Sequence, residues 1–381
     1  MKNFIAYCIR VMLYYLFRIF PVQNNKIFFQ NFNGKGYGDN PKYIAEEILR
    51  HGLNYKLVWA VRTESSDNFP LAIKTVPFKS IRAIFNEVTA KVWIDNCRKQ
   101  LYVRKRKEQF YIQTWHGAVN LKKIEKDAEH NLSTYYVKQA KYDSALANLF
   151  LSDSKFSSQL YRSAFWYKGE IFECGSPKDD ILINQYLNKK NKINQHFRID
   201  DNVKTILYAP TFRDNSCIDV YNLNFEQILL NLQKQTNNPW TFLVRLHPNI
   251  SQTSKFLTYT KNILNASYYD DMQELMLSCD ILITDYSDCM YEFALMNKPV
   301  FLYINDYKEY KKERGFYFNL FSLPFPCAND NKELLFNILH FDTAAYLKSL
   351  GVFFKEVGVF KDGNASKKVV DRIIAEMEKH D

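Results

Sequence analysis

Short apolar runs alternate with helical patterns along most of the chain, and this alternation limits the fold more than any other feature. Buried parallel strands read as brief runs of branched and aromatic residues, and each successive pair needs a crossover connection. The pattern therefore predicts an α/β protein with parallel sheets. The expected strands cover residues 26–30, 55–61, 91–95, 110–114 and 148–152 in the first half, and 205–208, 241–246, 280–284 and 300–303 in the second.

A chain of 381 residues has room for more than one domain. The polar segment 187–202, rich in Asn and Lys, separates the two series of strands and is expected to be the linker. We therefore expect two doubly wound domains that face each other across a cleft. They would cover residues 22–190 and 191–381, with a C-terminal helix in the second domain and a separate N-terminal helix over residues 1–21.

Residues 4–20 are nearly all apolar, but Arg10 and Arg18 interrupt them and Pro21 ends the run. The run is short for a membrane-spanning helix, and its two arginines would be costly at bilayer depth. Aromatic side chains mixed with basic ones favour a helix that lies on an anionic membrane surface. The alternative is the first helix of a packed domain.

The net charge of +10 favours anionic partners, which include nucleic acid, anionic lipid and phosphate-bearing substrates. Nucleic acid is not expected, because the basic residues are spread over the chain and no nucleic-acid-binding module is visible. The seven cysteines form no C-x-x-C pair, so they predict reduced thiols rather than disulfides or zinc ligands. No phosphate-binding P-loop and no cluster with metal-ligand spacing is present, so no metal or other cofactor is expected.

Chemically active side chains follow four of the expected strands. In parallel α/β sheets, ligands bind outside the carboxyl ends of the strands, so these positions predict a functional site. Two of the seven histidines are among them. The four segments are Trp115-His116-Gly117, Ala209-Pro210-Thr211-Phe212-Arg213, Leu246-His247-Pro248 and Asp285-Tyr286-Ser287-Asp288.

This set of residues suits phosphoryl transfer, which needs a proton acceptor, an in-line geometry and neutralised phosphoryl oxygens. His116 would accept the proton of an attacking hydroxyl, and His247 and Arg213 would hold phosphate oxygens. Ser287 stands at the start of the expected helix 288–297, where an anion is favoured, and Glu292 would bind ribose hydroxyls. The plainer alternative is that Asp285 and Ser287 only cap this helix.

The ordered motifs resemble the CDP-glycerol glycerophosphotransferase family, which includes primases and polymerases of teichoic acids and related capsular polymers. The resemblance runs from about residue 30 to about residue 310. Its motifs are Asn33-Gly34-Lys35, Asp39-Asn40-Pro41-Lys42, Gln113-Thr114-Trp115-His116-Gly117, Ala209-Pro210-Thr211-Phe212-Arg213, Arg245-Leu246-His247-Pro248, Ile283-Thr284-Asp285-Tyr286-Ser287 and Lys298-Pro299-Val300.

The resemblance implies a GT-B-like fold with an acceptor-facing first domain and a nucleotide-binding second domain. It implies transfer of glycerol phosphate from CDP-glycerol to a hydroxyl of a lipid-linked or growing polymer, with release of CMP and without a catalytic metal. It also implies peripheral attachment to the cytoplasmic face of the cell membrane.

Carried over by position, His116 resembles the base and His247 a second essential histidine. The other matching positions would contact substrate, and among them Thr211, Arg213, Ser287 and Glu292 fall where the donor is held. The full set of expected substrate-binding residues is Asp39, Asn40, Gly117, Pro210, Thr211, Arg213, Thr284, Asp285, Tyr286, Ser287 and Glu292.

The chain departs from the family pattern at three places. Ala118 and Val119 replace a common Thr-Pro, and Asp288 replaces a second serine, which would put a carboxylate beside the diphosphate. Glu292 replaces a shorter Asp and is compatible with another polyol, so a CDP-ribitol transferase is one alternative. The others are a GT-B nucleotide-sugar glycosyltransferase or epimerase, and an inactive protein that binds anionic polymer or lipid.

Overall fold

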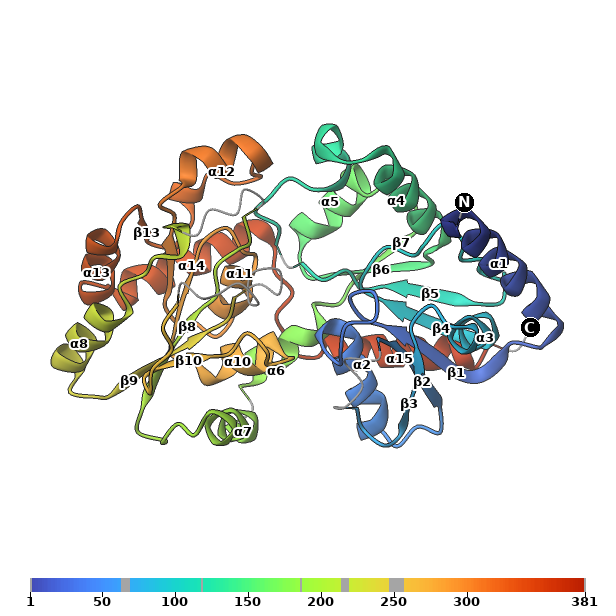
Figure 1. Ribbon diagram of the computed structural model, residues 1–381, viewed down its shortest axis with the longest axis horizontal. Helices are drawn as coiled ribbons and strands as arrows, with labels where there is room; N and C mark the ends of the chain where they lie inside the picture. The colour runs from blue at the N-terminus through green and yellow to red at the C-terminus, as the bar shows by residue number, and fades with distance from the viewer. Residues whose placement is uncertain are drawn as a thin grey trace. The chain divides into compact units, whose positions relative to one another are not determined.

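The computed structural model describes residues 2–62, 69–117, 119–185, 187–213, 219–246 and 257–379. These residues form two compact units, each built around its own parallel sheet (Figure 1). The first unit comprises Met1–Gly117, Ile124–Asp180 and Val359–Asp381, and the second comprises Ala118–Lys123 and Ile181–Gly358. The expectation of two parallel-sheet α/β domains is confirmed.

The sheet of the first unit has seven parallel strands within the described residues, in the order β3-β2-β1-β4-β5-β6-β7. The order of the strands reverses between β1 and β4, and such a switch point opens a crevice at the carboxyl ends of the two strands. The strands are β1 (Gln23–Gln30), β2 (Lys56–Val61), β3 (Ile73–Pro77), β4 (Ala90–Asp95), β5 (Phe110–Gln113), β6 (Leu149–Ser152) and β7 (Glu170–Glu173).

Helices cover both faces of this sheet. The core on one face includes side chains of α2 and α15, whereas the core on the other face includes side chains of α1 and α3. The helices of the unit are α1 (Lys2–Leu16), α2 (Asp39–Arg50), α3 (Ile81–Thr89), α4 (Thr134–Leu146), α5 (Lys155–Ala164) and α15 (Ala365–Met377), with short 3-10 helices at Phe17–Ile19, Glu125–Asn131 and Pro177–Asp179.

The sheet of the second unit has six parallel strands among the residues described, in the order β10-β9-β8-β11-β12-β13. Its switch point lies between β8 and β11. The strands are β8 (Lys204–Tyr208), β9 (Trp240–Val244), β10 (Ile263–Asn265), β11 (Ile281–Thr284), β12 (Val300–Tyr303) and β13 (Cys327–Ala328).

Side chains of α8 and α13 complete a core on one face of the second sheet. Deeply buried Ile228 and Leu334 are the examples from these two helices. The helices of the unit are α6 (Asp180–Asn184, whose first residue belongs to the first unit), α7 (Leu187–Phe197), α8 (Phe225–Thr236), α10 (Met272–Ser278), α11 (Cys289–Ala294), α12 (Tyr307–Arg314), α13 (Asn331–Leu339) and α14 (Thr343–Val357), with 3-10 helices at Asp219–Tyr221 and Leu320–Ser322.

The four strands that the sequence did not predict, β3, β7, β10 and β13, are the four edges of the two sheets. An edge strand pairs on one side only and is less enclosed, so it lacks the continuous apolar run of a central strand. β7, for example, reads Glu-Ile-Phe-Glu and has no fully buried residue. The interior strands lie within a few residues of their expected positions.

The C-terminal helix α15 packs in the first unit, whereas the sequence placed it with the second domain. In Figure 1 this red helix lies against the blue and cyan strands. Val369, Val370 and Ile373 are fully buried in the core beneath the sheet. The Asp180 carboxylate accepts hydrogen bonds from the backbone N–H groups of the first two residues of α15, at 2.9 and 2.7 Å, and so caps the helix.

The expected linker 187–202 is largely helical and belongs to the second unit. It contains α7, which packs against α10. Ile193 is fully buried, and the Lys192 ammonium lies 3.1 Å from the Glu274 carboxylate. Apolar residues are sparse in this polar stretch and produce little periodicity, so the composition favoured a linker although tertiary contacts stabilise a helix there.

Candidate active site

His116 lies just beyond β5 in the first unit, and its imidazole leans toward the β1/β4 switch point. Its Nδ1 atom is 2.7 Å from the carbonyl oxygen of Asn96, the residue that follows β4. A carbonyl oxygen can only accept a hydrogen bond, so Nδ1 carries the proton and Nε2 is the basic nitrogen of the neutral ring. This tautomer is the one that a general base at Nε2 requires.

Aromatic rings hold the imidazole of His116 in place. Trp115 stacks on it at a centroid distance of 4.5 Å, and Phe32, from the end of β1, meets it edge-on at 5.4 Å. Trp115 adopts a positive φ of 52°, which is unusual for a bulky residue. Its backbone N–H donates to Gln113 Oε1 at 2.9 Å, which helps to fix this turn.

Asn96 joins several strand ends through hydrogen bonds, a role that the sequence did not predict. Its carbonyl accepts from His116, while its side-chain amide donates to Asn31 Oδ1 at 2.7 Å and to Asp39 Oδ1 at 3.1 Å. Its Oδ1 accepts from the backbone N–H of Phe32 at 2.8 Å. The sequence does place Asn96 directly after an expected strand, where a side-chain amide can bond to the ends of neighbouring strands.

The predicted residues Asp39 and Asn40 lie at the first turn of α2, close to His116. Asn40 donates to the Trp115 carbonyl at 3.2 Å and accepts from Ser176 Oγ and the Lys178 N–H at 3.0 and 3.1 Å. It is buried, so it acts as a brace between two loops. The Asp39 carboxylate lies 3.6 Å from the Lys178 ammonium.

Lys178 is a second residue that the sequence analysis missed. Its ammonium donates to the carbonyl oxygen of His116 at 3.0 Å, and its side chain is almost fully buried. Lys178 directly follows Gly175-Ser176-Pro177, a turn-like sequence beyond an edge strand that was not predicted. This was the only feature of the sequence that could have marked it as a site residue. Gly117, which follows His116, is half-buried in the same loop. The first unit therefore brings together His116, Gly117, Asp39 and Asn40.

In the second unit, the ends of β8 and β11 meet at the Asp285 carboxylate. The Thr211 backbone N–H donates to its two oxygens at 2.9 and 3.0 Å, and the Thr211 hydroxyl donates at 2.5 Å. Pro210 is buried beside them, and the Thr284 hydroxyl donates to the Ala209 carbonyl at 2.7 Å. These bonds fix the two loops at the switch point.

The Arg213 guanidinium, which the sequence predicted as a phosphate ligand, contacts two carboxylates and a backbone carbonyl of the protein. Its Nε and Nη2 contact the two oxygens of Asp306 at 2.6 and 3.1 Å, and Nη2 also lies 2.9 Å from Asp285. Its Nη1 donates to the Thr211 carbonyl at 2.8 Å. Burial opposes the charge, yet the Asp285 and Asp306 carboxylates raise the pKa of the guanidinium above its ordinary value.

Tyr286 completes this buried network. Its ring stacks on that of Tyr310 at a centroid distance of 3.9 Å, and the central carbon of the Arg213 guanidinium lies 5.0 and 4.7 Å from the two ring centroids. The Tyr286 hydroxyl donates to Asp306 at 2.9 Å. Burial, and then the neighbouring Asp306, raise the pKa of the Tyr286 hydroxyl above its ordinary value. Thr284, Asp285 and Tyr286 are thus buried supports beneath the site.

Ser287 is half-buried above these supports, and its Oγ accepts a 3.4 Å hydrogen bond from the backbone N–H of Cys289. Glu292 points instead toward α10, where Gln273 donates to its carboxylate at 2.8 Å, and it is buried. The Asp288 carboxylate accepts from the backbone N–H of Leu121 at 2.9 Å. One oxygen of this carboxylate is therefore engaged by the 119–123 segment.

His247 lies outside the described residues. Within the described part of the chain, no group of three or more His, Cys, Asp or Glu side chains is arranged to hold a metal ion.

Comparison with known proteins identifies the chain. Residues 12–375 match the sequence model of the CDP-glycerol:poly(glycerophosphate) glycerophosphotransferase family. The chain belongs to this family. It is 30% identical over 366 residues to a teichoic acid poly(glycerol phosphate) polymerase of Staphylococcus epidermidis, covering 92% of this chain and 51% of that protein. It is 28% identical to a Bacillus spizizenii protein of the same name, covering 93% of each.

Solved structures agree with the family assignment. A structure of the wall teichoic acid polymerase TagF with CDPG matches with a TM-score of 0.85 and 28% identity. The match covers 97% of this chain and 94% of the solved TagF chain. A UDP-GlcNAc 2-epimerase from Neisseria meningitidis matches with a TM-score of 0.52 at 16% identity, over 92% of this chain and all of the epimerase. The second likeness concerns the fold alone. The chain spans about half the length of the staphylococcal polymerase.

Proposed function

We propose that this family member transfers glycerol phosphate from CDP-glycerol to a hydroxyl of a lipid-linked or growing teichoic acid or capsular polymer, and releases CMP. The observation that carries the proposal is the 2.7 Å contact between His116 Nδ1 and the Asn96 carbonyl oxygen, which assigns the ring proton to Nδ1 and makes Nε2 the basic nitrogen of the neutral ring. A positioned imidazole at a strand end suits deprotonation of an acceptor hydroxyl. The family match supports the choice of donor.

In the proposed reaction, His116 Nε2 accepts the proton of the acceptor hydroxyl. The hydroxyl oxygen then bonds to the phosphorus that carries glycerol, and the bond from this phosphorus to the bridging oxygen breaks. CMP leaves with that oxygen and the bonding electrons. The stacked Trp115 and the bond to Asn96 fix the ring, so that little reorganisation is needed during proton transfer.

The donor is tested by CMP release from the purified chain with an oligomeric or lipid-linked glycerol phosphate acceptor. CDP-glycerol and CDP-ribitol are supplied in parallel. We expect CDP-glycerol to react at least about 10-fold faster than CDP-ribitol. A pocket that fits glycerol discriminates only modestly against a longer polyol. Faster reaction of CDP-ribitol would reverse the donor assignment, and silence with both donors would overturn the activity.

The product separates the proposed activity from its alternatives. A nucleotide-sugar glycosyltransferase breaks the bond between sugar and diphosphate and so releases a nucleoside diphosphate, whereas the proposed transferase releases a monophosphate. An inactive binding protein would retain polymer without releasing either product. Asn96, Lys178 and Asn40 all form hydrogen bonds with the loop that carries His116. Such support of one side chain favours an enzyme over an inactive binding protein.

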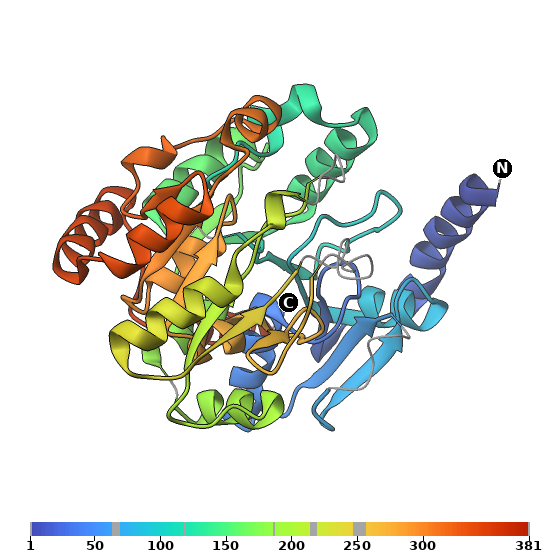
Figure 2. The same ribbon diagram turned by 60° about the vertical axis from the view of Figure 1, so that its left-hand side comes forward.

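We further propose that the chain binds peripherally to the cytoplasmic face of the cell membrane through α1. None of the helices in the described part of the chain is long and apolar enough to cross a bilayer. Figure 2 shows the N-terminal half of α1 standing clear of the sheet. The exposed large apolar side chains from this helix and the turn that follows are Phe4, Ile5, Ile9, Met12, Tyr15, Leu16, Ile19 and Phe20. An exposed apolar helix face of this kind suits a lipid surface. Arg18 follows this helix, whereas the Arg10 guanidinium lies over the Tyr102 ring on the packed side.

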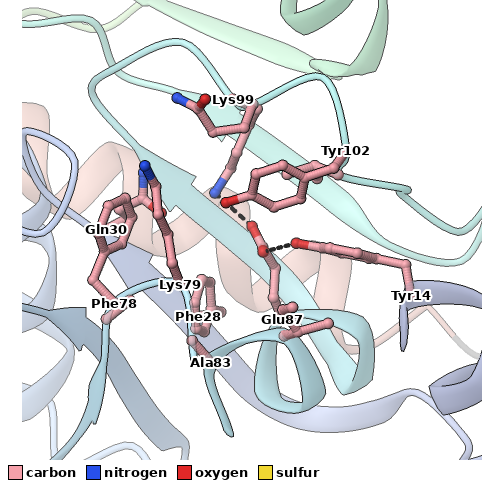
Figure 3. Close-up of a pocket in the computed structure, with 13 residues that line it drawn as sticks. Tyr14, Phe28, Gln30, Phe78, Lys79, Ala83, Glu87, Lys99 and Tyr102 are labelled. Atoms are coloured by element: carbon pink, nitrogen blue, oxygen red, sulfur yellow. Dashed lines mark hydrogen bonds and ion pairs between the residues drawn. The ribbon is translucent and has the colours of Figure 1, made fainter. Parts of the chain in front are cut away.

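The opposite face of α1 is fixed to the first unit. Tyr14 is fully buried, and its hydroxyl donates to Glu87 of α3, which also accepts from the Lys99 ammonium at 2.7 Å (Figure 3). Burial, and then the Glu87 charge, raise the pKa of the Tyr14 hydroxyl. A helix held on one side and apolar on the other would orient the unit on a membrane.

Replacement of both Ile9 and Met12 by glutamate tests the membrane proposal. Both side chains are exposed, so the double substitution should not disturb the buried Tyr14. We expect the double variant to bind anionic lipid vesicles roughly 10-fold more weakly or worse in a sedimentation assay, since it loses apolar burial and gains repulsion. Leu230→Glu, on an exposed face of α8, is the matched control and should bind as the unchanged chain does. Undiminished sedimentation of the double variant would refute the proposal.

A further inference from the structure

The first unit contains a buried arginine, Arg98, which lies two residues beyond Asn96 in the loop after β4. Its side chain is 4% exposed and lies between two carboxylates. Nη1 is 3.1 Å from Asp143 of α4, and Nη2 is 2.9 Å from Glu125 of the 3-10 helix Glu125–Asn131. Burial opposes the charge of the guanidinium, but Glu125 and Asp143 raise its pKa above the ordinary value. Arg98 is therefore a charged group fixed inside the protein.

The face of α4 that meets Arg98 is mostly polar. The buried residues of this helix are Gln139, Ala140, Asp143 and Ser144. Gln139 donates to the Arg98 carbonyl at 3.1 Å, and Arg98 Nη1 donates to the Ser144 hydroxyl at 2.9 Å as well as to Asp143. A helix that only packs against a core buries an apolar face. The buried face of α4 instead holds one arginine in place.

The guanidinium of Arg98 lies over the indole ring of Trp115. Its central carbon is 5.2 Å from the centroid of this ring and 5.0 Å from that of Phe165. The two aromatic rings meet edge-on at 4.8 Å. A planar guanidinium stacks on aromatic faces, which an ammonium group cannot do. The same indole stacks on His116 at 4.5 Å, so Trp115 joins the buried arginine to the imidazole.

A second connection runs from Asp143 through Gln113 to the same turn. The Gln113 amide donates to the buried Asp143 carboxylate at 3.2 Å, and Gln113 Oε1 accepts from the Trp115 N–H at 2.9 Å. Trp115 has a positive φ of 52°, and a bulky residue keeps such a backbone only where its surroundings hold it. Arg98 contacts the ring of Trp115, while Asp143 supports its backbone through Gln113.

We infer that Arg98 and Asp143 are positioning residues, which hold the Trp115-His116 turn so that Nε2 of His116 faces the acceptor hydroxyl. The inference rests on the proposed function, because it assigns supports to the base of that reaction. Both residues act through Trp115 and Gln113 rather than on the reacting atoms. A displacement of about 1 Å at a reacting group can cost roughly 10²-fold in rate, so these supports bear directly on turnover.

Arg98→Lys tests the inference, because lysine keeps a positive charge near the two carboxylates but loses the planar group that stacks on Trp115. With CDP-glycerol and a soluble oligomeric acceptor, we expect kcat to fall roughly 10- to 100-fold while KM for the donor changes little. Glu87→Gln is the matched control, since it weakens another buried ion pair of the same unit, with Lys99 at 2.7 Å. The control should retain kcat even if its melting temperature falls.

A second readout does not depend on turnover. The ring nitrogens of His116 are observed by NMR in protein with isotope-labelled histidine, at a pH where the ring is neutral, and are assigned by comparison with His116→Asn. We expect one tautomer, with the proton on Nδ1, in the unchanged chain and a mixture of both tautomers in Arg98→Lys. Absence of CMP release from the unchanged chain would reject the proposed function, whereas this spectrum would still test the positioning.

Asp143→Asn carries the same test if Arg98→Lys does not fold. It leaves Arg98 beside Glu125, so it should change kcat and the tautomer in the same direction. Full kcat together with an unchanged tautomer in a folded variant would overturn the inference. A fall in melting temperature and kcat with an unchanged tautomer would overturn it too, because Arg98 and Asp143 would then only stabilise the fold.

Discussion

Replacement of His116 by asparagine is expected to slow CMP release from CDP-glycerol by about 10²- to 10⁴-fold, the usual contribution of a general base. An asparagine amide nitrogen can occupy the place of Nδ1 and donate to the Asn96 carbonyl, which now accepts from the ring at 2.7 Å. The variant therefore retains the contact that positions the loop and loses the basic nitrogen. Turnover falls, whereas the fold and the donor affinity should remain.

Single-turnover CMP release, CDP-glycerol affinity and melting temperature together check this result. His130→Asn, an exposed histidine of the same unit, is the matched control and should retain full activity. A rate within 10-fold of the unchanged chain would remove His116 from proton transfer, since general bases contribute about 10² or more. A lower melting temperature together with lower activity would instead indicate that the ring has a structural role.

The sequence placed His116 and Asp285 directly after strands, as the structure has them, because strand ends are set by local signals. An apolar run followed by His116, or by Asp285, marks both a buried strand and the polar group at its carboxyl end. Parallel strands bring such ends to one edge whatever the details of packing. Asn40 and Thr284, however, are buried braces, and their motif positions carry no sign of that.

Features that depend on distant partners were not predictable in the same way. Asp306, which neutralises Arg213, is 93 residues away along the chain, so the two charges could not be paired from sequence. The apolar periodicity of α15 shows that one face is buried, but not which sheet receives it. Asn96 and Lys178 have roles that arise only when three strand ends and the loop after β7 meet.

Substitution of Arg213 by methionine is expected to lower the free energy of unfolding of the second unit by roughly 3–5 kcal/mol, as removal of one partner of a buried ion pair does. The change would leave Asp285 and Asp306 without the guanidinium that now lies 2.9 and 2.6 Å from them. It would also remove the cation that contacts the stacked rings of Tyr286 and Tyr310. Denaturant unfolding, monitored by far-UV circular dichroism, measures the loss.

A second substitution separates lost charge balance from lost packing. Asp306→Asn in the Arg213→Met background removes one of the two stranded carboxylates, so it should recover part of the stability, even though Asp306→Asn alone is destabilising. Asp285 retains donors from Thr211 and Tyr286, so recovery should be incomplete. A loss below about 1 kcal/mol in Arg213→Met, typical of an exposed ion pair, would contradict a supporting role. Combined with weakened CDP binding, that result would return Arg213 to the ligand role suggested by its sequence.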